Sequence, residues 1–454
     1  MRANIKRGER ERVVIVGGGL GGLELAQRLR KSEFQVVLVD KNNYNQFPPL
    51  IYQVASAGLE PSNISFPFRR VFQGMKHYFF RMGEVKSVDT EEKAIQTSFG
   101  TVHYDHLVLA AGATTNFFGN KNIEEQAMPM KTVTESMRLR NTIFQNLERA
   151  ETEDNADRKQ ALMNIAIVGG GPPGVEIAGV LAEMKRTIVP RDHPDLDVSK
   201  MNIYLINADD RLLKSMDPAS SARAEKDLAK LGVKIMLKSM VTDYVDKQVV
   251  LKDGTTIPAE TVIWVSGIRA NTIEGIPAES IGRGGRILTD RYNRVKGLDE
   301  VYAIGDQPLV EGDDEYPQGH PQLAQVAIQQ ARTLAGNLLH QERPFKPFAY
   351  RNLGVMATIG RNKAVAEIWR LKFGGIAAWL LWLVVHLRSI LGVKNKTVVF
   401  LNWLWSYINY KQSLRLILRL VDKSHATEAE EIHLASLLSL CRLTCKTESG
   451  AQTI

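Results

Sequence analysis

The chain has 454 residues, of which 44% are hydrophobic and 24% are charged. This is the composition of a globular protein with room for two or three domains. Its two cysteines, Cys441 and Cys445, exclude a disulfide framework and a four-cysteine metal site, and we expect no metal. The polar, basic start MRANIKRGERER predicts no signal peptide, and the scarcity of cysteine favours a cytoplasmic setting.

The net charge of +8 is concentrated in one part of the chain. Residues 368–421 hold eight basic side chains and no acidic one, so the basic and acidic residues of the remaining chain balance. A local excess of this kind indicates a local partner of negative charge, either a membrane surface or a nucleic acid.

Residues 12–27, RVVIVGGGLGGLELAQ, predict a strand, a glycine-rich turn and a helix. In such a turn Gly17 permits the tight bend, Gly19 lets the backbone approach a pyrophosphate, and Gly22 allows the helix to pack closely on the strand. The next strand, QVVLVD, ends at Asp40, whose carboxylate is placed to accept from an adenosine ribose hydroxyl. The helix N-terminus would hold the phosphates. This pattern predicts a dinucleotide site.

The same pattern recurs in residues 164–179, NIAIVGGGPPGVEIAG, with its glycines at Gly169, Gly171 and Gly174. A strand, NIYLINADD, again follows. Two complete turns predict two bound dinucleotides.

Two later segments, YDHLVLAAGATTNFFG (104–119) and VYAIGDQPLV (301–310), complete a resemblance to two-dinucleotide flavoproteins. The second segment has the form of a strand that returns to the first domain. The resemblance implies that FAD lies on the first turn and NAD(P)H on the second, in an inserted domain. The implied FAD contacts are Gly17, Gly19, Leu20, Gly22, Asp40, Lys41, Val85, Ala111, Gly112, Gly305, Asp306 and Ala324. The implied NADH contacts are Gly169, Gly171, Pro173, Gly174, Glu176, Asn207 and Gly267.

The choice between NADH and NADPH stays open, with NADH favoured. NADH-using members usually end the second strand in a glutamate, whereas Asn207 stands at the matching position. Its amide can bond a ribose hydroxyl but does not repel a 2′-phosphate. Asp209 and Asp210 could supply the carboxylate, and Arg211 lies close to them in sequence.

Four segments resemble type II NADH:quinone oxidoreductases in particular. They are DKNNYNQFPPLIYQVASAGL (40–59, with Asn45 in place of the usual histidine), AQVAIQ (324–329), LGVMATIGRNKAV (353–365) and GGIAAWLLWLVVHL (374–387). The resemblance implies hydride transfer from NADH to FAD and two-electron reduction of a membrane quinone, menaquinone or ubiquinone, by a homodimer. With no cysteine before residue 441, disulfide reductases and sulfide:quinone oxidoreductases do not fit.

The candidate catalytic residues are polar side chains at this quinone site. Gln325 and Gln329 stack on one face of a predicted helix over 321–339, where uncharged amides could bond quinone carbonyls. The spacing alone fits a solvated polar face as well. The resemblance assigns Glu176 to NADH binding or to proton delivery, whereas Glu24 at the equivalent place is explained by the helix dipole. Lys363 is a weaker candidate from the segment GRNKAV.

The basic region predicts a peripheral, monotopic membrane anchor. Residues 373–391 are apolar, but His386 and Arg388 interrupt them well before the ~20 residues that a bilayer requires. Residues 397–408 are shorter still, and residues 411–423 place bases at four-residue intervals against leucines. Five of the six tryptophans lie in this region, which favours anionic lipid over nucleic acid. A buried dimerisation helix would explain the leucines but not the unopposed bases. We therefore expect no proton pumping and a place on the cytoplasmic face of the inner membrane.

The predicted fold is α/β, with two Rossmann-like dinucleotide-binding domains and a C-terminal amphipathic helical region. The expected division is 1–119 and 276–350 for FAD, 120–275 for NADH, and 351–454 for the anchor. Two other functions compete with quinone reduction. One is reduction of a soluble protein acceptor such as a ferredoxin, and the other is NADH sensing with a structural FAD.

Overall fold

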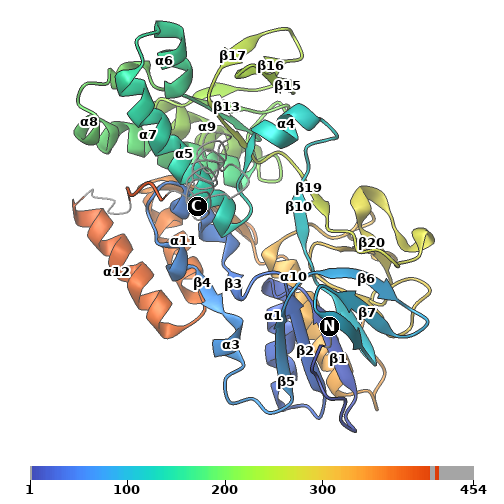
Figure 1. The fold of residues 1–454 in the computed structure, drawn as a ribbon. Helices are drawn as coiled ribbons and strands as arrows, with labels where there is room; N and C mark the ends of the chain where they lie inside the picture. Colours follow the sequence, from blue (N-terminus) through green and yellow to red (C-terminus); the bar gives the residue numbers. More distant parts are fainter. Residues whose placement is uncertain (1–2, 410–414, 419–454) are drawn as a thin grey trace, which may run out of the picture. The chain divides into compact units, whose positions relative to one another are not determined.

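The computed structural model describes residues 3–409 and 415–418 (Figure 1). Its first sheet has five parallel strands, in spatial order β21 (Val301–Ala303), β9 (His106–Leu109), β1 (Arg12–Val16), β2 (Gln35–Asp40) and β5 (Tyr78–Met82). Because β21 pairs with β9, the strand before Gly305 does return to the sheet of the first turn. This prediction from the sequence is confirmed.

Both faces of the first sheet are buried. Helices α1 (Leu20–Arg28) and α10 (Ala324–Leu339) pack on each other and contribute to the apolar core that contains Val13 and Ile15. Val14 and Val16, which point to the opposite side of β1, belong to a second core. Burial on two sides explains why β1 is an unbroken β-branched run rather than an alternating one.

The second sheet repeats the arrangement with five parallel strands. In spatial order they are β11 (Met128–Pro129), β18 (Thr261–Trp264), β12 (Asn164–Val168), β13 (Asn202–Ile206) and β14 (Lys234–Met236). Its helices are α5 (Val133–Thr152), α6 (Ala156–Met163), α7 (Pro172–Thr187), α8 (Val189–Asp192) and α9 (Pro218–Lys230). The chain passes between the two sheets along an antiparallel pair, β10 (Ala113–Thr115) and β19 (Ile268–Ala270). Two Rossmann-like units are thereby confirmed.

Short elements complete these two units. The antiparallel ones are β3 (Tyr44–Gln46) with β4 (Ser65–Pro67), then β6 (Val85–Asp89) with β7 (Ala94–Thr97) and β8 (Gly100–His103), and β15 (Val241–Val245) with β16 (Gln248–Leu251) and β17 (Thr256–Pro258). A parallel pair joins β20 (Ile287–Thr289) to β22 (Pro308–Val310). The short helices are α2 (Ile51–Ala55), α3 (Phe68–Val71) and α4 (Lys121–Gln126).

The C-terminal region is an antiparallel sheet followed by two helices. The strands are β23 (Val355–Gly360), β24 (Lys363–Ile368) and β25 (Leu371–Gly374), and the helices are α11 (Ile376–Ser389) and α12 (Val393–Asn409). The apolar segment 373–391 is therefore not one helix, because Gly375 at φ +68° turns the end of β25 into α11. No helix among the described residues is both long and apolar enough to cross a membrane.

Most of the segment 411–423, with its bases at four-residue intervals, lies outside the described residues, and residues 415–418 have no regular secondary structure. Cys441 and Cys445 also lie outside the described residues.

Helix α7 and strand β23 are in unusually close contact. At Gly179, in the middle of α7, an added Cβ would lie 1.8 Å from the backbone oxygen of Ile359. Only a residue without a side chain allows this approach, so Gly179 sets the distance between the second sheet's helix and the C-terminal region.

We predict that Gly179→Ala lowers the free energy of unfolding by about 2 kcal/mol, because the new methyl group forces α7 and β23 apart. Gly336→Ala in α10 is the matched control, because nothing lies within 4 Å of that Cβ position. At an open position inside a helix, alanine has a higher helix propensity than glycine. Thermal unfolding should show a lower midpoint for the first variant and an equal or higher one for the second. Equal midpoints for the two variants would contradict the prediction.

Candidate functional site

The first glycine turn has the geometry of a phosphate cradle. Gly17 has φ +99° and a Cβ there would lie 2.3 Å from the oxygen of Ala110, while a Cβ at Gly22 would lie 1.9 Å from the oxygen of Gly17. Both positions therefore require glycine for packing. At Gly19, by contrast, nothing lies within 4 Å. This open side faces the start of α1, whose first N–H groups lack helical partners, so the residues present fit a bound pyrophosphate.

The second turn repeats this geometry. A Cβ at Gly169, where φ is +121°, would lie 2.8 Å from the oxygen of Val265, and one at Gly174 would lie 1.8 Å from the oxygen of Gly169. The nearest atom to a Cβ at Gly171 is 3.9 Å away, on Pro173. The chain thus holds two cradles that each fit a dinucleotide.

A side chain at the end of the neighbouring strand holds each turn. Asp40 accepts from the N–H of Gly18 at 2.6 Å, and Asn207 accepts from the N–H of Gly170 at 3.1 Å. Burial raises the pKa of the Asp40 carboxyl, although its backbone hydrogen bonds lower it. The Asn207 Nδ2 donates to the oxygen of Arg211 at 3.0 Å. The oxygen and the nitrogen of this amide therefore join the glycine turn to the loop that follows β13.

The segment around Gly305 and Asp306 lies at the end of the first sheet, where three residues that the sequence did not single out hold it. Gln330 accepts from the N–H of Gly305 at 2.7 Å, and the Lys131 Nζ lies 3.6 Å from an Asp306 carboxylate oxygen. Gln307 is fully buried and accepts from the N–H of Ala111 at 2.6 Å. Gln307 could have been noticed as the neighbour of the Gly-Asp pair, whereas nothing in the sequence links Lys131 to this site.

The other implied cofactor contacts lie at the ends of elements around the two turns. Leu20 and Ala324 begin the neighbouring helices α1 and α10, and Gly112 has φ +68° with open space around it. Lys41 is exposed directly after β2, and Val85 begins β6. Pro173 is exposed in the first turn of α7, and Gly267 precedes β19 against the Phe118 ring.

Gln325 and Gln329 lie on one face of α10, as their spacing predicts, but both amides already have backbone partners. Gln325 donates to the oxygen of Gly354 at 3.0 Å and accepts from the N–H of Leu353 at 2.9 Å. Gln329 donates to the oxygen of Arg351 at 2.9 Å and accepts from its N–H at 3.0 Å. The two amides therefore clamp residues 351–354 to α10, and contact with a quinone stays a prediction.

Glu176 lies in the first turns of α7, where it is partly buried between that helix, β23 and α11. Its carboxylate accepts from the N–H of Thr358 at 3.4 Å. Burial raises the pKa of this carboxyl to about 8, despite the opposing effects of Thr358 and Trp382. The group is therefore mostly protonated at neutral pH. Lys363 begins β24 and its charge acts on Glu183, so the structure does not bring it into the same contact.

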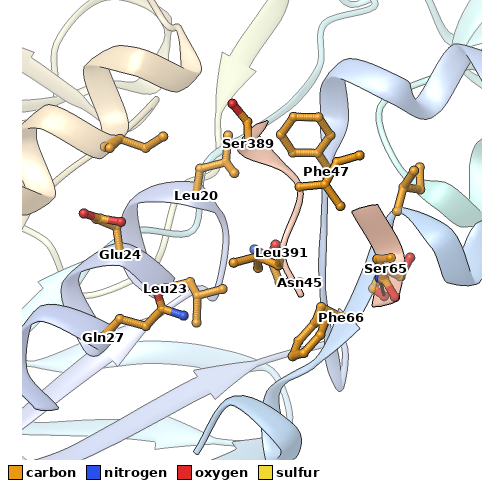
Figure 2. A pocket seen from close by; sticks show the side chains of 14 residues that line it. Leu20, Leu23, Glu24, Gln27, Asn45, Phe47, Ser65, Phe66, Ser389 and Leu391 are labelled. Carbon is orange, nitrogen blue, oxygen red and sulfur yellow. Dashed lines mark hydrogen bonds between the residues drawn. The ribbon is translucent and has the colours of Figure 1, made fainter. Parts of the chain in front are cut away.

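A small cavity of about 90 Å³ lies beside the first cradle (Figure 2). Leu20 and Leu23 of α1, Phe66 of β4 and Leu391 from the corner between α11 and α12 point toward it. Glu24 at its edge pairs with Arg332 of α10 at 2.7 Å. The corner between α11 and α12 therefore lies beside α1, the helix that begins at the first cradle.

The family comparisons agree with this geometry. The family model described as pyridine nucleotide-disulphide oxidoreductase matches residues 11–331, and one described as the NDH2 C-terminal domain matches residues 352–409. The type II NADH:quinone oxidoreductases NdhA and Ndh of Mycobacterium tuberculosis are each 33% identical to this chain. The NdhA match covers 87% of both chains, and the Ndh match covers 89% of both.

The chain belongs to the type II NADH:quinone oxidoreductase family. The resemblance seen in its sequence motifs is thereby confirmed.

A solved structure shares the fold of this family member. The NDH2 of Plasmodium falciparum in complex with NADH superimposes with a TM-score of 0.83 at 19% identity, covering 90% of this chain and all of that one. The sulfide:quinone oxidoreductase of Aquifex aeolicus gives a TM-score of 0.67 at 18% identity, covering 90% and 93% of the two chains. At these identities the likeness shows the fold alone.

We predict that Asn207→Asp makes this type II family member discriminate more strongly against NADPH. The carboxylate keeps an acceptor for the N–H of Gly170 and adds a charge that repels a 2′-phosphate, while it gives up the hydrogen bond that Asn207 donates to the oxygen of Arg211. Steady-state kinetics should show the KM for NADPH rising about tenfold more than the KM for NADH. If the ratio of the two KM values stays constant in Asn207→Asp and changes in Asp210→Asn, the exposed Asp210 is the side chain that contacts the ribose.

Proposed function

We propose that this chain is a peripheral-membrane enzyme that oxidises NADH and reduces a membrane quinone, menaquinone or ubiquinone, without pumping protons. The observation that carries the proposal is the pair of complete dinucleotide cradles, one in each parallel sheet, in a chain of this family. Bound FAD would supply the chemistry, accepting a hydride from NADH and passing two electrons to the quinone.

In this proposal the first cradle binds FAD and the second binds NADH. The return of β21 to the first sheet supports a FAD domain formed by residues 1–119 and 276–350, with the NADH domain at 120–275 inserted between them. Gly305 and Asp306 would then lie at the flavin's ribityl and pyrophosphate groups, held there by Gln330 and Lys131.

Glu176 is the proposed proton carrier of this site. With a pKa of about 8 its carboxyl holds a proton at neutral pH and releases it as the pH rises through that value. Gln325 and Gln329 each retain one N–H and one lone pair beyond their backbone bonds, which leaves them able to bond a quinone carbonyl.

Helices α11 and α12 are the proposed membrane contact. Among the described residues they expose large apolar side chains, including Val384, Val393 and Trp405 at 64%, 81% and 62% exposure. Arg388 and Lys394 are exposed at the corner between the two helices. Apolar and basic groups side by side favour an anionic bilayer surface, which we assign to the cytoplasmic face, and not a nucleic acid. We also propose that the chain forms a homodimer, because the family resemblance implies one.

An anaerobic visible spectrum tests both half-reactions. We expect a flavin band that NADH bleaches and that a short-chain quinone promptly restores. Bleaching without restoration would replace the quinone with a soluble protein acceptor or favour an NADH sensor. If no flavin band appears even after FAD is added back, the assignment of the first cradle is wrong.

We predict that the double variant Arg388→Gln/Lys394→Gln binds vesicles rich in anionic lipid about 30-fold more weakly. Each basic residue near such a surface contributes ~1 kcal/mol, and two are lost. The control, Lys86→Gln/Lys121→Gln, removes the same charge from exposed residues of β6 and α4. Sedimentation with the vesicles measures the difference, and equal binding of the two variants would argue against the proposed surface.

A further inference from the structure

The indole N–H of Trp382 is buried without a hydrogen-bond partner. Trp382 lies on α11 and is 1% exposed, and its Nε1 has no acceptor within hydrogen-bonding geometry among the described residues. A buried donor without an acceptor is costly and uncommon, so this N–H calls for an acceptor in the working protein.

The group next to this N–H is the Glu176 carboxyl. The Trp382 side chain acts on that carboxyl and lowers its pKa, although the two groups stop short of a fully formed hydrogen bond. Among the described residues, the N–H of Thr358 also donates to this carboxyl, at the long distance of 3.4 Å. The carboxyl therefore has room for a closer bond to the indole.

A buried hydroxyl from helix α2 lies near Trp382. Tyr52 is 5% exposed, its ring lies 6.4 Å from that of Trp382, and burial together with the charge of Glu176 raises the pKa of its hydroxyl well above the ordinary value. The hydroxyl accepts from the Gln53 Nε2 at 2.9 Å, which leaves its own hydrogen to donate. Gln53 in turn accepts from the Trp403 Nε1 of α12 at 2.8 Å.

The ionisable groups around this contact leave Glu176 without a direct ion pair among the described residues. His386 of α11 stacks on Trp382 with 4.0 Å between the ring centroids, and its Nδ1–H donates to the backbone oxygen of Trp382 at 2.7 Å. Burial lowers the pKa of His386 to about 4, so the ring is neutral at pH 7. The charge of Glu183, further along α7, contributes to the raised pKa of Tyr52. The positive charges of Arg361 and Lys363 act to lower the pKa of Glu183.

We propose that Trp382 is a positioning residue for the reaction, whose indole N–H holds the Glu176 carboxyl from α11 while the Tyr52 hydroxyl holds it from α2. The inference rests on the proposed function, in which this carboxyl carries a proton. Because α11 supplies Trp382 and α12 supplies Trp403, the two helices that would touch the membrane also set the surroundings of the carboxyl.

The test is the pH profile of NADH-to-quinone turnover in Trp382→Phe. Phenylalanine keeps an aromatic ring against His386 and Tyr52 but removes the N–H that favours the carboxylate. We expect the alkaline limb of the profile to move up by about one pH unit. Tyr52→Phe should move the limb in the same direction for the same reason.

The matched control is Trp379→Phe, which makes the same chemical change one turn earlier on α11, where the ring stacks on Tyr407 at 5.6 Å. Its profile should coincide with that of the unchanged protein. The inference is overturned if Trp382→Phe leaves the limb in place or if Trp379→Phe moves it equally.

Infrared difference spectroscopy of the FAD-loaded protein gives a readout other than activity. The carboxyl band that disappears in Glu176→Gln should shift in Trp382→Phe and in Tyr52→Phe, and an unshifted band in both overturns the inference. If Trp382→Phe does not fold, Tyr52→Phe decides the outcome. Failure of the unchanged protein to reduce quinone would instead count against the proposed function.

Discussion

Both dinucleotide turns depend on one hydrogen bond, from the middle glycine N–H of the turn to a side chain at the end of the next strand. Gly18 donates to Asp40 in the first turn and Gly170 donates to Asn207 in the second. This bond ties the loop to the neighbouring strand and leaves the first N–H groups of α1 and α7 available for phosphate. An amide oxygen can accept from the same N–H as a carboxylate, at 3.1 Å instead of 2.6 Å, so the geometry survives the change from Asp to Asn while the charge does not.

Helix α7 extends the effect of the second turn to the C-terminal region. Its first residues form the cradle, Glu176 follows, and Gly179 brings the helix against the backbone of Ile359. Because an α-helix is rigid, α7 fixes the positions of the cradle, the Glu176 carboxyl and β23 relative to one another. Trp382 and Trp403 then bring α11 and α12 to the same place, which links the proposed lipid contact to the proposed reaction site.

The glutamine pair on α10 illustrates how a correct spacing can have an unexpected use. Residues 351–354 belong to no helix or strand, and their backbone groups need hydrogen-bond partners. Gln325 and Gln329 provide these partners by bonding the N–H and C=O groups as a neighbouring strand would. The same amides hold residues 351–354 in place whether or not a quinone reaches their remaining donors and acceptors.

The sequence by itself determined the features that depend on neighbouring residues. Both strand–turn–helix units, the strand end at Asp40, the place of Asn207 directly after its strand, and the shortness of the apolar C-terminal segments follow from local spacing and side-chain type. The family motifs added the return of β21 to the first sheet. Only the tertiary structure decided that Gln330 and Lys131 hold the Gly-Asp segment, that Asn207 bonds to the oxygen of Arg211 in its own loop, and that the Trp382 side chain lowers the pKa of Glu176. These contacts join residues that are distant in the chain or depend on how a loop folds back. A sequence contains many polar side chains that could form the same hydrogen bond, and only the packing of the folded chain decides which of them does.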